Sequence, residues 1–544
     1  MFDRGSGAAV RVRVRARRDV CGARVSAAAA IGRAELHPPA LPPSAILCVR
    51  WMRVAESIGA PHDLAARRRF ERALQLTVAE LARGALRPAD GPISRCDAVL
   101  FDDLAELLAC LARDWVDGRA ADRWWWRTLL RARASLELVT NTWADAGPHI
   151  APAFQRLAAS GGAAAFASAL DARQVRLLAA ATSLAHGGPS VTDLLIRRAP
   201  DQPMAPAHVP AGTGRMSTIA DAVTSLARRY GAASSSTPLR YDQCALVALA
   251  AVARHSQRLL QQTRFVDAFH AALDSMRSEA KTPLVDTSLT GRDRRRDERH
   301  GVRDTTAAIP PSPSEAPELL RRHEHVQLQG AYCGDPAPDP AETIACHIDS
   351  GIAADGASQV SEASPSTCPS TAVVSPVAPF TDTPLGGVFY LLNVAIALRL
   401  YGDFTMPRRR GLPLSPWDFL ALAAEQWLGE PLDAATASLL ARLAGHAPGG
   451  RPGDRLFRRD RLARWVPRLV CRINRRVACA LGEPAEGATA RRLLCHHARV
   501  YVTEAHVDVM FDLESLPVDI RLAGLDRNPG WIPSAGRIVT LHYS

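Results

Sequence analysis

The densest group of residues that could bind a metal lies near the end of the chain, in CHHARVYVTEAHVD. It supplies Cys495, His496, His497, His506 and Asp508, and zinc is bound by about four such thiolate, imidazole or carboxylate groups that converge on one point. Side chains alternate between the two faces of a strand, so His506 and Asp508 share one face and the valines beside them share the other. We therefore interpret His506 and Asp508 as the solvent-exposed side of a surface strand, and we predict no metal here.

Two adjacent carboxylates, Asp102 and Asp103, form a second candidate site. Paired carboxylates act as a general acid and a general base when both reach one substrate. Neighbouring side chains on a helix point about 100 degrees apart, so these two cannot serve one substrate together. We interpret them as an exposed face of a helix, with Asp97 as its N-cap.

Three tryptophans stand side by side in DRWWWRTLL. Three consecutive indoles on a helix cannot all face one core, and Arg123 or Arg127 could stack on the rings. Aromatic and arginine side chains are also enriched at protein interfaces. Two interpretations stay open: a helix wedged between two layers of one domain, or a docking surface for another protein made of Trp124, Trp125, Trp126 and Arg127.

A tight turn is predicted at GLDRNPGWIP. Asn528, Pro529 and Gly530 have the composition of a turn, because proline presets φ and glycine adopts positive φ at low cost. Asp526 could accept backbone N–H groups, and Trp531 could pin the turn to a helical layer. We interpret Asp526, Asn528, Pro529, Gly530 and Trp531 as a structural corner, with a binding loop as the alternative.

The sequence contains no P-loop, GxGxxG, HExxH, GxSxG or protein-kinase motif. We therefore predict no catalytic residue, no cofactor and no metal, and a protein that is not an enzyme. The alternative is an enzyme with an unrecognised active site in the helical middle of the chain. A cleft that gathers titratable side chains from distant segments would favour that alternative.

The net charge of +11 invites a nucleic-acid interpretation, but the composition argues against it. The chain has a single lysine, Lys281, so arginine supplies nearly all of the 66 basic residues. This bias is typical of the codon usage of a GC-rich genome, and the charge is spread along the chain. We regard nucleic acid as an unlikely partner, and keep an arginine-rich nucleic-acid-binding protein as a second alternative.

Cysteine usage and hydropathy indicate a soluble cytoplasmic protein. The 11 cysteines are scattered and form no CxxC pair, which is typical of reduced, mostly buried thiols. The most apolar run, Val388 to Leu398, is far shorter than the roughly 20 residues that span a membrane, so we expect a buried helix. We predict no membrane partner.

The predicted fold is mainly α, with small β modules at both termini and a long disordered linker. AVRVRVRA near the N-terminus alternates as a strand does, whereas apolar residues recur at helical spacing in the middle. Pro, Ser and Ala enrichment marks the linker. The predicted parts are a β-helix-β module at 1–58, a helical domain at 59–280, the linker at 281–380, and a helical region ending in a small β-sheet at 381–544.

Several element boundaries can also be predicted. Gly84 is expected as the C-cap of the helix in HDLAARRRFERALQLTVAELARG. Ser415 is expected as the N-cap of the helix in LSPWDFLALAAEQWLG, with Pro416 at its first position. Near the C-terminus we expect strands in ARVYVTEAHVDVMFDL, PVDIRLAG and RIVTLHYS.

Four C-terminal segments share a family likeness: TPLGGVFYLLNVAIALRLYGDF, LSPWDFLALAAEQWLG, ARVYVTEAHVDVMFDL and RLAGLDRNPGWIPSAGRIVTLHYS. They resemble an uncharacterised protein family associated with gene clusters of extracellular contractile injection systems, the phage-tail-like particles. The resemblance covers Thr383 to Ser544 and is fainter over PPSAILCVRWMRV and ADRWWWRTLL. It implies a cytoplasmic, non-enzymatic component or assembly factor of such a particle, whose partners are other particle proteins. It brings no catalytic residues with it.

Overall fold

The structure is a computed structural model. It describes residues 12–15, 25, 27–31, 37–38, 41–57, 63–91, 93, 96–130, 134–196, 213–232, 238–281, 345–349, 379–409, 411–447, 450, 459–483, 488–515 and 517–544. Nearly all of the predicted linker, 281–380, lies outside the described residues.

A three-stranded antiparallel sheet contains strands from distant parts of the sequence. Its order is β1 (Val12–Arg15), β5 (Ala345–Asp349) and β3 (Trp51–Ser57). The alternating segment AVRVRVRA thus supplies a strand, as predicted. The middle strand β5 lies within the stretch predicted as linker, where the short alternation of Cys346 and Ile348 with His347 and Asp349 is the local strand signal. Helix α2 (Leu64–Arg83) contacts β3 and ends at Gly84, the predicted C-cap.

A second, two-stranded sheet joins β2 (Ile46–Val49) to β4 (Ala98–Phe101). All four residues of β4 are buried, because the strand is covered on both sides. The prediction that Asp97 caps a helix is therefore wrong. The chain first forms this strand, and Asp103 is the N-cap of α3 (Leu104–Val116).

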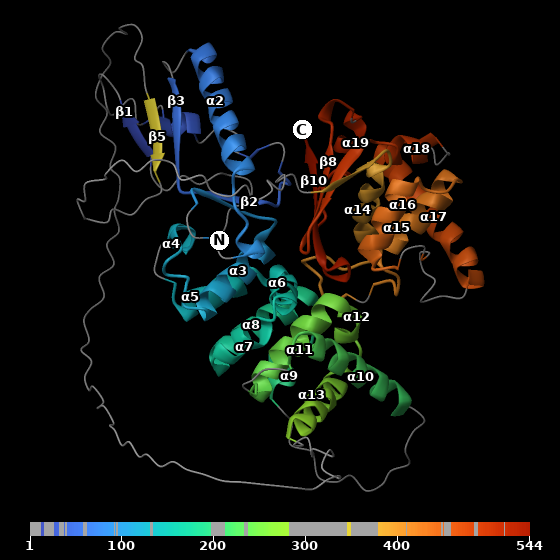
Figure 1. Cartoon of the computed structure of the whole chain (residues 1–544). Coiled ribbons are helices and arrows are strands. Elements are labelled where there is room, and N and C mark those ends of the chain that lie inside the picture. The colour runs from blue at the N-terminus through green and yellow to red at the C-terminus, as the bar shows by residue number, and fades with distance from the viewer. Residues whose placement is uncertain are drawn as a thin grey trace, which may run out of the picture. The chain divides into compact units, whose positions relative to one another are not determined.

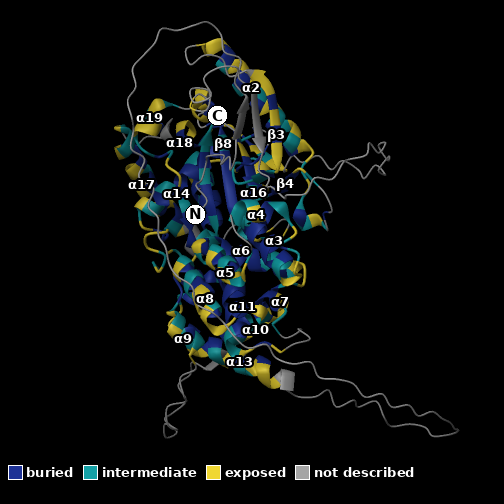
Figure 2. Cartoon of the chain, turned by 90° about the vertical axis from the view of Figure 1, so that its left-hand side faces the viewer, coloured by how far each residue is buried: buried dark blue, intermediate teal, exposed yellow. Residues whose placement is uncertain are grey.

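The middle of the chain is helical, as predicted. Its longest buried segment is in α11 (Tyr241–His255), where every residue from 243 to 253 is buried (Figure 2). Alanine fills much of this helix, and its small side chain lets neighbouring helices approach closely while favouring the helical backbone. The helical middle also contains α4 (Trp124–Leu130), α5 (Leu136–Asp145), α6 (Gly147–Ala159), α7 (Ala163–Ala169), α8 (Ala172–His186), α9 (Val191–Leu195), α10 (Thr213–Arg229), α12 (Gln257–Leu260) and α13 (Phe265–Lys281).

The C-terminal part contains a five-stranded sheet. Its order is β6 (Phe380–Thr383), β7 (Ala498–Val502), β8 (His506–Phe511), β10 (Arg537–Tyr543) and β9 (Gly530–Ile532). Strands β8 and β10 pair in parallel, and the other neighbours are antiparallel. The central strand β8 is buried over most of its length (Figure 2).

Helices pack against one face of this sheet and share its hydrophobic core (Figure 1). They are η2 (Gly386–Phe389), α14 (Tyr390–Ala397), α15 (Pro416–Leu428), α16 (Ala434–Ala444), α17 (Arg459–Leu481) and α18 (Ala488–Leu494). The apolar run 388–398 lies in η2 and α14 and is largely buried, as expected. Helix α15 begins at Pro416 with Ser415 as its N-cap, and both predictions are confirmed.

One predicted C-terminal strand is a helix instead. PVDIRLAG forms α19 (Val518–Leu522), in which Ile520 alone is buried. Val518 and Leu522 are exposed, so the segment buries only one apolar side chain and gains little from pairing in a sheet. The fold class is confirmed: the described residues are mainly helical, with small sheets near both ends of the chain.

Candidate functional site

The structure brings carboxylates, histidines and arginines of the helical middle against the C-terminal sheet. They come from α3, α6 and β8, and His149 and His506 are 357 positions apart in the sequence. We call this group the buried polar contact, and define it as Asp103, Glu106, His149, Arg156, His506 and Asp508.

Asp103 joins the start of α3 to the turn between β7 and β8. Its Oδ1 accepts the backbone N–H of Glu106 at 2.9 Å, and its Oδ2 accepts that of Ala505 at 3.2 Å. The side chain is fully buried. Burial by itself would raise the pKa of Asp103, but the Arg156 guanidinium, the His506 ring and the hydrogen bonds to the carboxylate outweigh it and hold the pKa below its ordinary value.

Glu106 lies at the centre of the charges next to Asp103. Its carboxylate is 2.9 Å from an Arg87 nitrogen and 3.2 Å from an Arg156 nitrogen. Asp102 pairs with the same two arginines, at 2.6 and 3.4 Å. Burial and the neighbouring Asp102 charge raise the pKa of Glu106, against the opposing effect of the two guanidinium groups. The two cations and the two carboxylates thus form one network.

The two histidines of the contact bond to each other. Nε2 of His149 lies 3.1 Å from Nε2 of His506, and both side chains are buried. A hydrogen bond between two ring nitrogens requires one to donate its proton and the other to accept it. One Nε2 atom therefore carries the proton of this bond and the other accepts it. The ring on α6 and the ring on β8 must be in complementary protonation states.

Asp508 connects the sheet to the N-terminal part of the chain. Its Oδ1 lies 3.2 Å from Nε2 of His542, and its Oδ2 accepts the backbone N–H of Ser44 at 3.2 Å. Burial would raise the pKa of Asp508, but the hydrogen bond from His542 and the His506 ring outweigh it, so the pKa is lowered.

Two predictions about these residues are wrong. His506 and Asp508 are buried rather than solvent-exposed, and so is Asp103, while Asp102 is half-buried and ion-paired. The alternation along β8 was correctly read: Val507, like Val509 and Phe511, lies in the hydrophobic core on the other face. The polar face is covered because α3 and α6 bring polar partners to it, and strand periodicity carries no information about such partners.

The potential zinc ligands do not converge. His506 and Asp508 belong to the buried polar contact, whereas Cys495 is exposed and His497 lies near Asp382, at 3.6 Å. His496 is buried and bonds to the backbone oxygen of Arg492 at 2.7 Å. Among the described residues, no group of three or more His, Cys, Asp and Glu side chains is arranged to hold a metal ion.

The tryptophan run lies mostly inside the protein. Trp125 and Trp126 are buried, and Nε1 of Trp126 donates to Asp114 at 2.9 Å. Trp124 is half-buried and donates to the backbone oxygen of Cys96 at 3.0 Å, while Arg127 is exposed. These contacts fit a helix wedged between two layers. They leave only an edge of Trp124 and the Arg127 side chain for another protein, so docking here stays a prediction.

The turn at 526–531 packs against both the sheet and the helical middle. Nε1 of Trp531 donates to the backbone oxygen of Ala185 at 2.7 Å, and its ring lies edge-on to His186. Oδ1 of Asn528 accepts the backbone N–H of Leu541 at 2.7 Å, and Gly530 has a φ of 70°. Pro529 precedes this glycine.

Asp526 completes the turn. Its carboxylate lies 3.4 Å from Nε of Arg521, and its backbone oxygen accepts the Tyr543 hydroxyl at 3.1 Å. These contacts are those of a packed corner, and we retain that interpretation.

Further contacts hold the helical middle against the C-terminal part. Arg254 donates to Glu504 at 2.5 Å and to the backbone oxygen of Gly536 at 3.2 Å. Gly187 has a φ of 65°, and a Cβ at this position would lie 2.1 Å from the backbone oxygen of Pro407. Only glycine allows so close an approach.

The outer face of α17 carries a row of arginines, which we call the arginine face and define as Arg464, Arg468, Arg472, Arg475 and Arg476. All five are exposed, while Val466, Leu469, Ile473 and Val477 on the opposite side are buried. Positions three and four apart are neighbours on a helix surface, so these like charges lie side by side. The spacing RxxxRxxxRxxRR is present in the sequence, but the net charge of the whole chain does not reveal it.

The arginine face has few internal partners. Arg468, Arg472, Arg475 and Arg476 form no ion pair with any described residue, and the described part of α17 from 464 onward contains no acidic residue. Cys471 and Cys479 are exposed on the same side. The described cysteines are free, and three of them are exposed, more than expected.

The buried polar contact is packed rather than open. Five of its six residues are buried, and none of the six lines the pocket near η1 (Pro88–Asp90) or the pocket beside Gly187. The enzymatic alternative is not tested by these contacts and stays a prediction. Within the described part of the chain, no helix combines the length and the apolar character that crossing a bilayer requires.

Comparison with known proteins adds no relative to this picture. No protein family, no curated protein and no solved structure matches the chain. The resemblance of the C-terminal segments to an uncharacterised family associated with gene clusters of contractile injection systems therefore stays an expectation from the sequence.

Proposed function

We propose that the chain is a non-enzymatic structural or assembly component of a contractile injection particle, that it resides in the cytoplasm, and that it works through contacts with other proteins. The observation that carries the proposal is the arginine face of α17. We propose that this face binds an acidic surface of another particle protein.

The arginine face lowers the stability of α17 when no partner is bound. Arg468, Arg472 and Arg476 follow one another at four-residue spacing, and like charges at this spacing destabilise a helix by about 0.2–0.5 kcal/mol for each pair. A partner that supplies carboxylates would remove this repulsion and form charge-assisted hydrogen bonds. The repulsion in the free chain is therefore a reason to expect an acidic partner.

A protein partner is favoured over nucleic acid for two reasons. Arginine is enriched among the residues that contribute most to protein interfaces, since its long planar side chain both packs and forms several hydrogen bonds. Helix α17 also lies within residues 383–544, the part of the chain that resembles the particle-associated family. Nucleic acid is the second candidate, because the same row of charge could neutralise phosphates.

The buried polar contact supports a structural role. Its carboxylates and imidazoles are engaged with one another and with backbone N–H groups across the junction of the helical middle and the C-terminal sheet. Buried polar groups that bond to one another across a junction restrict its motion. A rigid body that presents a charged face suits a component that must hold its partner in a defined orientation.

The test is a pull-down from cells that produce the particle, with identification of sheath, tube and baseplate proteins. The variant is Arg468→Glu with Arg472→Glu. The control is Arg68→Glu with Arg72→Glu, which makes the same charge change at the same spacing on exposed positions of α2. Capture by the wild type and the control, and its loss in the α17 variant, would support the proposal.

Two results would count against it. Failure of the wild type to capture any sheath, tube or baseplate protein would contradict the particle assignment. DNA binding that falls steeply with salt and disappears in the α17 variant would assign the arginine face to nucleic acid instead.

A further inference from the structure

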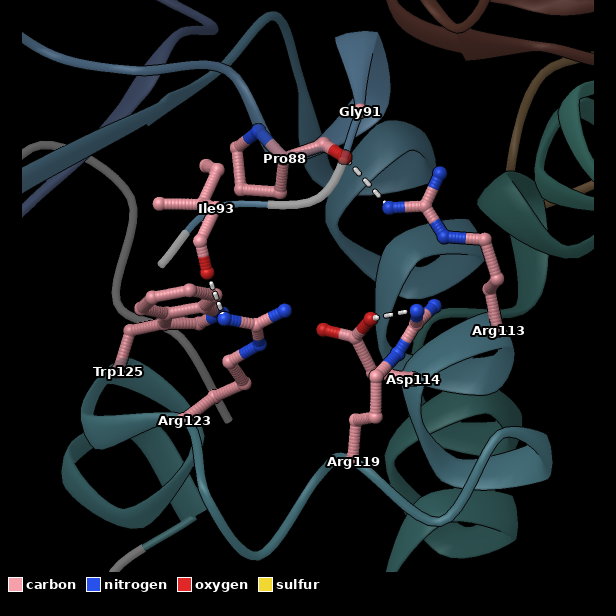
Figure 3. A pocket seen from close by; sticks show the side chains of 8 residues that line it. All are labelled: Pro88, Gly91, Ile93, Arg113, Asp114, Arg119, Arg123 and Trp125. Carbon is pink, nitrogen blue, oxygen red and sulfur yellow. Dashed lines mark hydrogen bonds and ion pairs between the residues drawn. The ribbon is translucent and has the colours of Figure 1, made fainter. Parts of the chain in front are cut away.

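A pocket lies where η1, the end of α3 and the start of α4 meet (Figure 3). Its volume is about 140 Å³, several times the roughly 30 Å³ that a water molecule occupies in the liquid. Its walls include Pro88, Ile93, Arg113, Asp114, Arg119, Arg123 and Trp125. The tryptophan run and the end of a well-packed helix thus shape a space large enough for a small ligand.

The charges around this pocket are unequal. Figure 3 shows three guanidinium groups around the space, with Arg123 on one side, Arg113 and Arg119 on the other, and the Asp114 carboxylate between them. Arg119 lies 3.8 Å from Asp114. Arg113 and Arg123 instead donate to the backbone oxygens of Pro88 and Ile93, which carry no net charge. Arg119 also pairs with Asp117, which lies outside the pocket lining, so three guanidinium groups meet two carboxylates and an excess of positive charge remains.

The pocket wall also holds hydrogen-bond donors that the described residues leave unused. Nε of Arg113, of Arg119 and of Arg123 is buried and bonds to no described atom, and so is Nε1 of Trp125, a residue only 3% exposed. Buried N–H groups in folded proteins almost always have a partner. A ligand that offers several acceptors around one centre could bond to these four donors.

We propose that this pocket binds a single phosphate group, either as inorganic phosphate or as the monoester of a small molecule. A phosphate presents several oxygens in a tetrahedral arrangement, and guanidinium groups bind it through charge-assisted hydrogen bonds. The site is independent of the arginine face, which lies on α17, and of the partner proposed for it.

Asp114 determines which oxyanion the pocket accepts. Its carboxylate accepts the Trp126 indole N–H at 2.9 Å and lies 3.8 Å from the Arg119 guanidinium. An ionised carboxylate can only accept hydrogen bonds. It therefore favours an anion that still carries a proton, as hydrogen phosphate does near neutral pH and a phosphate monoester does below its second pKa of about 6, and disfavours sulfate, which carries none.

The experiment is isothermal titration calorimetry of the full-length protein with inorganic phosphate, glycerol phosphate and sulfate. We expect phosphate near neutral pH, or glycerol phosphate below about pH 6, where it keeps a proton, to bind at least about tenfold more tightly than sulfate, a ratio typical of one lost hydrogen bond to a charged group. The stronger of the two phosphate ligands distinguishes free phosphate from a monoester.

Two variants and a control locate the binding. Arg123→Gln and Arg119→Gln each remove one guanidinium from the pocket, and each should weaken phosphate binding about tenfold or more. Arg119 is partly exposed, so its variant should fold even if Arg123→Gln does not. Arg173→Gln removes an exposed arginine of α8, far from the pocket lining, and should bind phosphate as the wild type does.

The proposal is overturned if neither phosphate ligand binds at millimolar concentration. It is also overturned if sulfate binds as tightly as phosphate, or if Arg119→Gln, shown to be folded by its thermal transition, binds phosphate with unchanged affinity.

Discussion

At the buried polar contact every carboxylate meets a cation, an imidazole or a backbone N–H group, whereas on α17 four arginines meet no described residue of opposite charge. Charged side chains thus have opposite effects in the two regions. Inside the protein they hold the helical middle and the C-terminal sheet together, and on α17 they repel one another. Removing a charge should therefore destabilise the first region and leave the second unharmed.

Loss of Asp103 should have the largest effect. Asp103→Ala removes the N-cap of α3, leaves the Ala505 N–H without its acceptor and takes a negative charge from beside Arg156. We expect the free energy of unfolding to fall by about 3 kcal/mol or more, measured by urea denaturation. The matched control is Asp63→Ala, which removes an exposed N-cap from α2 and should cost about 1 kcal/mol. Equal losses of unfolding free energy in the two variants would mean that Asp103 stabilises the protein as an N-cap only, and that its other buried contacts contribute nothing.

Acid should weaken the same junction through His186. Burial lowers the pKa of this imidazole to about 3, below the roughly 6.5 of an unfolded histidine. The unfolded chain then binds the proton more readily, so the stability contributed by neutral His186 is complete above about pH 6.5 and is lost as pH falls toward 3.

Between about pH 7 and about pH 5, the wild type should lose about 2 kcal/mol more stability than His186→Leu, which has no proton to gain. Denaturant titrations at both pH values measure the difference. Parallel losses in the two proteins would show that His186 does not titrate in this way.

A smaller loss is expected at Trp531. Trp531→Phe keeps an aromatic ring but removes the N–H that bonds to the backbone oxygen of Ala185, and we expect a cost of about 1 kcal/mol. Trp427→Phe is the control, since the Nε1 atom of Trp427 bonds to no described residue. Thermal unfolding of both variants measures the contrast, and a larger loss for Trp427→Phe would refute the role given to the corner.

The smallest effect, and one of opposite sign, is expected on α17. Arg472→Glu places a carboxylate four residues from both Arg468 and Arg476 and should raise stability by about 0.5 kcal/mol. Arg491→Glu should instead lower it slightly, since Arg491 pairs with Glu430 at 2.9 Å on the surface. If Arg472→Glu were clearly destabilising, the arginine face would have internal partners and the comparison above would fail.

The helices and their boundaries were predictable because their signals are local. Gly84, Ser415 and Pro416 mark helix ends within a few residues of the turns they terminate or begin. The alternation of β8 was predictable for the same reason. The prediction that Asp97 caps a helix was wrong, because four buried apolar residues form a strand before the helix begins.

The buried polar contact could not be predicted, because its partners come from separate segments. Nothing near His506 in the sequence indicates that His149 will cover it. A polar face on a strand looks the same in the sequence whether water or another histidine lies against it. The pocket at Arg113, Arg119 and Arg123 likewise depends on how a turn brings the end of one helix beside the start of the next.

The position of β5 bears on the order in which the chain can fold during its synthesis. This strand lies between β1 and β3 but follows β3 by roughly 290 residues. At about 5–20 residues per second, a ribosome needs roughly 15 to 60 seconds to make that stretch. During that time β1 and β3 have left the ribosome without the strand that pairs with both of them. Their unpaired edges then need a chaperone or a temporary pairing to avoid aggregation.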